Sequence, residues 1–155
     1  MKNKVFNTTF ENMLRILLLM GVLNAPANSD RLTALDFICI YGNKCKVLDS
    51  NLHGNNEFGF AEFANKREKI AEAIKLAVKN AYVDVEQGQD GFVYSLNDRG
   101  EKIIAAIQSP YVKSYMLGAK IITRKFARTS DEDILKYISK MATESKEAWG
   151  CSLLE

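Results

Sequence analysis

One stretch of the sequence, residues 63–100, constrains the fold most, because its hydrophobic pattern changes twice. From Phe63 to Ala81, apolar residues recur at the spacing of one helix face. They are Phe63, Ile70, Ile74, Ala77 and Ala81. From Tyr82 to Leu96, apolar and polar residues alternate as in paired strands, with Asp90-Gly91 as the turn, and polar residues then open another helix. The stretch therefore predicts a helix, a hairpin and a second helix, in that order.

That order is typical of a winged-helix module, and the rest of the chain adds helices around it. The further predicted helices run from Thr8 or Thr9 to Leu23 and over about 31–41, 98–108, 110–128 and 131–149. A long loop, 43–60, separates the second helix from the third. The sequence thus predicts a mainly α, winged-helix-like single domain over 1–155, with a wing at 82–96 and C-terminal helices within 110–149.

The first predicted helix is apolar nearly all round, and only Arg15 interrupts its apolar band. One side carries Met13, Ile16, Leu17 and Met20, and nearly the opposite side carries Leu14, Leu18 and Val22. Such a helix is either the centre of the core or has one face covered by another protein chain. Both alternatives are open from the sequence.

The hairpin is a poor candidate for DNA binding, although winged helices commonly bind DNA. A DNA-binding wing contacts phosphate through Lys or Arg, but the stretch from Tyr82 to Leu96 contains no base. It carries Asp84, Glu86 and Asp90 instead, and these would repel phosphate. The loop 43–60 is also far longer than the turn of about three or four residues in a helix-turn-helix.

Positive charge gathers instead in the helix predicted at 110–128. The segment from Pro110 to Thr129 holds five bases and no acid, and several bases share one stripe at helical spacing. The residues of this basic strip are Lys113, Lys120, Arg124 and Arg128. They suit contact with phosphate or with a partner protein, and a solvated helix face is the simpler alternative.

We find no set of residues that would make this chain an enzyme, and we expect no cofactor and no metal. His53 and Cys45 lack an identifiable catalytic partner, and the three cysteines form no CxxC pair. The acids at 131–133 most simply start the last helix, with a metal or acid-base role as the alternative. The longest uninterrupted apolar run is far shorter than the roughly 20 residues that cross a bilayer, and we expect a cytoplasmic protein.

Motifs spread over residues 6–126 carry a family resemblance. They are Phe6-Asn7, Glu11, Leu14-Arg15, Arg31-Leu32, Leu35-Asp36-Phe37, Glu62, Arg67, Gly91, Tyr94 and Ser109-Pro110-Tyr111. In order and spacing they resemble the middle component of bacterial three-component ABC-ATPase (ABC-3C) systems, including the small third subunit of Lamassu-type anti-phage defence.

The resemblance implies a non-catalytic adaptor, a complex subunit that bridges an SMC/Rad50-like ATPase and an effector nuclease of the same operon in anti-phage or anti-plasmid defence. Non-specific DNA contact within the complex is a further expectation. The residues we expect to meet a partner are Arg15, Leu18, Val22, Arg31 and Arg67, besides the basic strip. A winged-helix transcription regulator, or a small enzyme using His53 or Cys45, is the alternative function.

Overall fold

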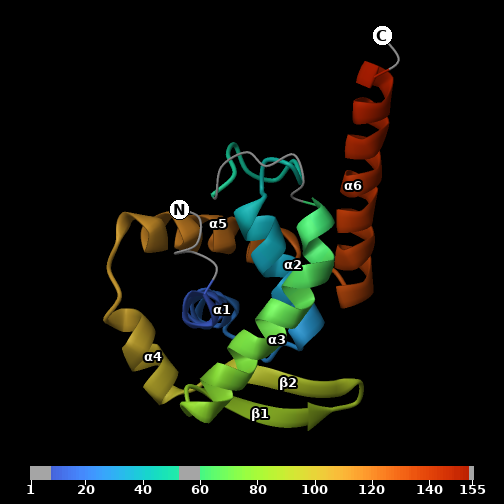
Figure 1. Ribbon diagram of the computed structural model, residues 1–155. Coiled ribbons are helices and arrows are strands. Elements are labelled where there is room, and N and C mark those ends of the chain that lie inside the picture. The colour runs from blue at the N-terminus through green and yellow to red at the C-terminus, as the bar shows by residue number, and fades with distance from the viewer. Residues whose placement is uncertain (1–7, 53–59, 154–155) are drawn as a thin grey trace.

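The protein, seen here as a computed structural model, is described for residues 8–52 and 60–153 and is built mostly from helices (Figure 1). The elements are α1 (Thr9–Leu23), α2 (Ser29–Ile40), a 3-10 turn η2 (Phe60–Glu62), α3 (Phe63–Lys79), β1 (Val83–Gly88), β2 (Gly91–Leu96), α4 (Asp98–Ala105), α5 (Pro110–Lys125) and α6 (Asp131–Leu153). This arrangement of helices and one antiparallel hairpin confirms the predicted mainly α, winged-helix-like fold.

Two apolar helices, α1 and α2, form the centre of the core. Side chains 12, 13 and 15–20 of α1, and every side chain from Leu32 to Ile40 in α2, are buried. The helices α3, α4 and α5 all pack against α1, and α6 packs against α2. The all-round apolar pattern of α1 therefore reflects a central helix covered by its own chain.

The helix starts follow from local side-chain hydrogen bonds. Thr8 caps α1 by accepting from the backbone N–H of Glu11, and Ser109 caps α5 by accepting from Val112, with Pro110 in the first helical turn. Both starts confirm the sequence prediction. Helix α2 begins at Ser29, two residues before the predicted 31, because the side chain of Asn28 caps it by accepting from the N–H of Arg31.

The hairpin has the predicted strands and a turn shifted by one residue. Val83 pairs with Leu96 and Gly88 with Gly91, which leaves Gln89 and Asp90 as the turn; Gly91 has a positive φ of 120°. Ala27 forms an isolated bridge to Tyr94, so a short third segment flanks β2. The hairpin is thereby anchored to the chain before α2.

Helix ends in the second half differ from the sequence prediction by a few residues. Helix α4 ends at Ala105 and α5 at Lys125, before the predicted 108 and 128, whereas α6 continues to Leu153. Such ends depend on fraying and capping, which periodicity does not report. Helix α6 begins at Asp131 as predicted, and Ser130 caps it by accepting from the N–H of Asp133.

The loop after α2 is partly described, and its first half packs onto the body. Cys45 is buried, and Leu48 lies against Gly42, where a Cβ would collide with the leucine side chain. Tyr137 of α6 donates a hydrogen bond to the carbonyl of Cys45. Residues 53–59 of the predicted loop, with His53, lie outside the described residues. Among the described residues, none of the helices is both apolar and long enough to cross a bilayer.

Candidate partner-binding surfaces

A buried cluster of side chains around Asp36 joins four of the helices. Asp36 of α2 is fully buried and accepts hydrogen bonds from Arg15 at 3.1 Å and from the Tyr115 hydroxyl at 2.7 Å. Lys66 of α3 lies 3.1 Å from the same carboxylate. One carboxylate thus ties together α1, α2, α3 and α5, and we call these four residues the buried charge cluster.

The charge states within the cluster follow from burial and from its pairs. Burial alone would raise the pKa of Asp36, but the charges of Arg15 and Lys66 and the hydrogen bonds to the carboxylate outweigh it. The pKa of Asp36 is therefore held well below its usual range. Burial lowers the pKa of Lys66, against the attraction of Asp36, and raises that of Tyr115. Asp36 is accordingly an anion at neutral pH, held by two cations and a neutral phenol.

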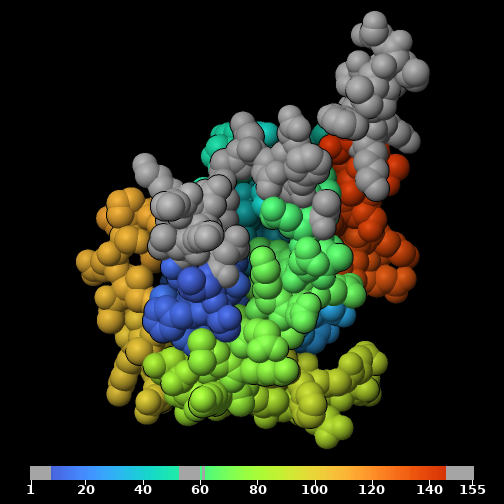
Figure 2. Space-filling model, in the orientation of Figure 1, coloured from blue at the N-terminus to red at the C-terminus, as the bar shows by residue number. Residues whose placement is uncertain are grey.

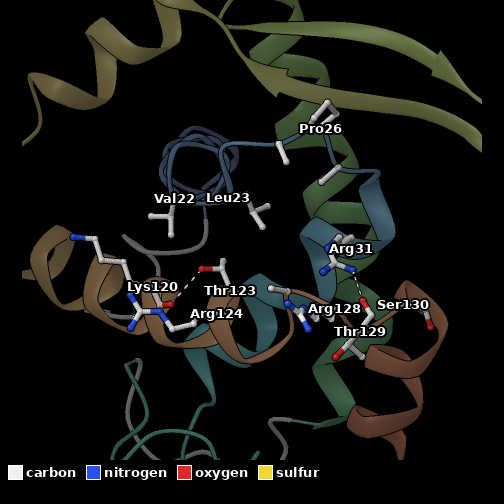
Figure 3. A pocket seen from close by; sticks show the side chains of 13 residues that line it. Val22, Leu23, Pro26, Arg31, Lys120, Thr123, Arg124, Arg128, Thr129 and Ser130 are labelled. Carbon is white, nitrogen blue, oxygen red and sulfur yellow. Dashed lines mark hydrogen bonds between the residues drawn. The ribbon is translucent and has the colours of Figure 1, made fainter.

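An open groove of about 790 Å³ lies between α1, the start of α2 and the end of α5. Figure 3 shows Val22 and Leu23 of α1 facing Lys120 and Thr123 of α5 across it. The predicted partner-binding residues that line this groove are Val22, Arg31, Lys120, Arg124 and Arg128. The fold therefore brings five predicted residues from three parts of the sequence into one place.

Arg31 holds one end of the groove together. Its guanidinium donates to the carbonyls of Thr129 at 2.8 Å and Phe126 at 2.9 Å and pairs with Asp131 at 2.9 Å. Asn28 donates to the same carboxylate at 2.6 Å. These bonds satisfy carbonyl groups beyond the end of α5. The charge of Arg31 is thus used within the fold, and it positions the turn between α5 and α6.

The outward face of α5 combines unpaired bases with exposed apolar side chains. Lys113, Lys120 and Arg124 form no ion pair among the described residues. Leu117 is 64% exposed and Ile121 51% exposed, and helical spacing places both beside these bases. We call this face, with Arg128, the basic surface. Two acids at the start of α6 pair elsewhere, Asp131 with Arg31 and Glu132 with Lys136.

A second apolar surface lies at the other end of the molecule, between α3 and the hairpin. Val78, Val85 and Phe92 are 41%, 41% and 57% exposed and line one open groove together with Lys75 and Lys79. We call it the hairpin groove. In Figure 1, α5 and the hairpin lie on opposite sides of α1. The protein therefore presents two exposed apolar surfaces, which belong to elements on opposite sides of α1.

Comparison with known families gives a match over nearly the whole chain. Residues 5–148 match the family described as ABC-three component (ABC-3C) system Middle Component 2. The chain belongs to this family. No curated protein and no solved structure matches it. The family resemblance seen in the sequence is thereby confirmed at the level of the ABC-3C middle components.

Membership makes this middle component an accessory subunit of an ABC-ATPase system, as its family description implies. An accessory subunit works together with the other components of its system. The hairpin lacks the basic side chains of a DNA-binding wing, because β1 and β2 carry no base, and Lys66 of α3 is turned inward to Asp36.

Some predicted partner-binding residues lie away from the groove. Arg15 and Leu18 are 2% and 4% exposed. They line a separate pocket of about 220 Å³ between α1 and the start of α5, together with Tyr111. Arg67 is half exposed on α3, near Asp30 at 3.8 Å and over the ring of Phe63. Lys113 lies near the start of α5 and does not line the groove.

Sequence reasoning missed several residues that define these surfaces. The sequence did not indicate that Asp36 and Lys66 form an ion pair, because thirty residues separate them in the chain. The exposure of Leu117, Ile121 and Phe92 also went unnoticed. The available signal for Asp36 was a charged residue inside the otherwise uncharged stretch from Leu32 to Ile40, because a buried carboxylate requires a cationic partner.

Two alternative chemical roles considered from the sequence find no support in the local structure. The Cys45 thiol is buried, which raises its pKa to about 12, so it is protonated at neutral pH. The acids at 131–133 lie at the start of α6, where Asp131 and Glu132 form ion pairs. Among the described residues, no group of three metal-ligating side chains comes together.

Proposed function

We propose that this middle component is a non-catalytic adaptor that joins an SMC/Rad50-like ATPase subunit to an effector nuclease. The system would be a Lamassu-type anti-phage or anti-plasmid defence system in the cytoplasm. The observation that carries the proposal is the pair of exposed apolar surfaces on opposite sides of α1. A bridging subunit needs two separate contact surfaces, whereas an enzyme needs one convergent site.

The basic surface suits a protein partner with acidic and apolar side chains. Leu117 and Ile121 lie among the bases, and burying them stabilises a complex only against another apolar surface. A DNA backbone offers phosphate for Lys120 and Arg124 but little apolar surface. We therefore assign this surface to a protein partner, with non-specific DNA contact as a lesser contribution from the same bases.

The groove beside the basic surface strengthens this assignment. Val22 and Leu23 form an apolar wall opposite Lys120 and Arg124, so a helix or loop of the partner would find one apolar and one charged side. Arg31 keeps the groove in shape through its bonds to the turn between α5 and α6. The site is thus preorganised, which lowers the entropic cost of association.

The experiment is a charge reversal on α5. The full chain and the variant Lys120→Glu with Arg124→Glu are each mixed with the purified ATPase and effector components of the same system, and dissociation constants are measured at several salt concentrations. We expect the variant to bind one component at least tenfold more weakly, because two attractive pairs become repulsive. Binding by the wild type should weaken as salt is added.

The matched control is Lys136→Glu with Lys140→Glu, which makes the same change of charge on α6. We expect the control to bind like the wild type. Equal binding by all three forms would contradict the assignment of the basic surface. A mobility shift with arbitrary DNA as strong as protein binding, lost in the α5 variant, would make DNA its principal ligand.

A further inference from the structure

The free edge of the hairpin is a surface of β1 that nothing in the described structure covers. Strand β2 pairs with β1 on one side and with Ala27 on the other, whereas β1 pairs with β2 alone. Every residue of β1 after Val83 is exposed. Figure 2 shows the hairpin forming a ledge that extends beyond the body of the molecule. Such an edge is a ready template for another strand.

The register shows which backbone groups point outward from this edge. Tyr94 exchanges two hydrogen bonds with Ala27, N to O at 3.0 Å and 2.8 Å, so its N–H and C=O point away from β1. Its partner Val85 must then belong to a pair that is not hydrogen-bonded, because paired residues alternate along an antiparallel ladder. The N–H and C=O groups of Val85 and, two residues on, Gln87 therefore point outward.

The side chains around this edge specify what could pair with it. Val85 lies on the hairpin face that lines the hairpin groove, beside Val78 and Phe92. Asp84 and Glu86 alternate with Val85 and so lie on the opposite face. A strand added to β1 would place one set of side chains near the apolar groove and the other set near two carboxylates.

Charge selects the partner strand. Two copies of this chain pairing through β1 would bring Asp84 and Glu86 of one copy against those of the other, which is unfavourable. The segment from Tyr82 to Leu96 contains acids and no base that would relieve this repulsion. A strand with Lys or Arg at alternate positions would form cross-strand pairs of opposite charge instead.

We infer that β1 accepts an extended segment of a partner subunit by β-strand addition, with apolar residues toward the hairpin groove and basic residues toward Asp84 and Glu86. This inference rests on the proposed adaptor function and assigns one of its contacts. Backbone hydrogen bonds to Val85 and Gln87 would provide affinity, and the alternation of apolar and basic side chains would provide specificity.

The test uses proline at an outward-facing N–H. Gln87→Pro removes that donor without removing a hydrogen bond between β1 and β2, and Gln87→Thr changes the side chain but keeps the donor. Each form of the full chain is titrated with the ATPase component and with the effector component. We expect Gln87→Pro to bind one of them at least tenfold more weakly than Gln87→Thr. Hydrogen exchange in the wild-type complex should slow at Val85 and Gln87.

A second variant, Asp84→Lys with Glu86→Lys, tests the charge selection and should weaken the same interaction. Equal binding by Gln87→Pro and Gln87→Thr would overturn the inference while leaving the adaptor function intact. Failure of both components to bind the wild type would overturn both. Dimers of the isolated wild-type chain that disappear in Gln87→Pro would show that a second copy occupies the edge, and would also overturn the inference.

Discussion

Replacing the central carboxylate of the buried charge cluster, Asp36→Asn, should destabilise the protein strongly. Asp36 is fully buried. Its carboxylate accepts two hydrogen bonds from Arg15 and one from Tyr115, and it forms an ion pair with Lys66. Asparagine is nearly the same size but leaves two buried cations without an anion. Removing one partner of a buried ion pair typically costs about 3–5 kcal/mol. That is a large share of the roughly 5–15 kcal/mol that stabilise an ordinary domain.

The assay is equilibrium unfolding in urea, followed by circular dichroism, from which the free energy of unfolding is obtained. The matched control is Asp131→Asn, since the pair between Arg31 and Asp131 is partly exposed. A pair of that kind contributes at most about 1 kcal/mol. If the Asp36→Asn protein loses no more free energy of unfolding than the control, the buried charge cluster does not stabilise the fold.

Three further predictions follow from the same structure. The pKa of Asp36 is well below its usual range, so its contribution to stability is complete above about pH 4 and is lost as the pH falls further. Urea unfolding between pH 2 and 7 should show this loss in the wild type and not in Asp36→Asn. Gly100→Ala should lower the free energy of unfolding by about 1–3 kcal/mol, because its Cβ would collide with the carbonyl oxygen of Tyr82, and an unchanged urea midpoint would contradict this. Cys39 and Cys45 should resist a thiol reagent at pH 8 in the native protein and react after unfolding, because burial raises the pKa of both thiols. Rapid labelling of either thiol in the native state would contradict this prediction.

Local patterns in the sequence were sufficient for most of the helices and for the hairpin. The starts of α1, α5 and α6 were predicted correctly, because a capping bond, here to Thr8, Ser109 or Ser130, involves neighbours in the chain. The alternation around Val83 and Leu96 predicted the strands for the same reason. Errors fell at helix ends and at the turn, where one residue more or less changes little in the local pattern.

The surfaces were harder to predict, because they depend on packing between distant segments. Val22, Arg31 and Lys120 meet in one groove only once α5 lies across the ends of α1 and α2. Helical spacing placed Lys120 and Arg124 on one face but did not reveal that Leu117 is exposed beside them. The pairing of Arg15 with Asp36 was not predicted, because the two residues lie on different helices.

The most direct test of the account is native mass spectrometry of the reconstituted three-component system, with and without this middle component. The account predicts that the ATPase and effector components form a ternary complex with this chain and associate far more weakly when it is left out. Stable association of those two components without it, with the middle component remaining a free monomer, would contradict the central claim that it bridges them.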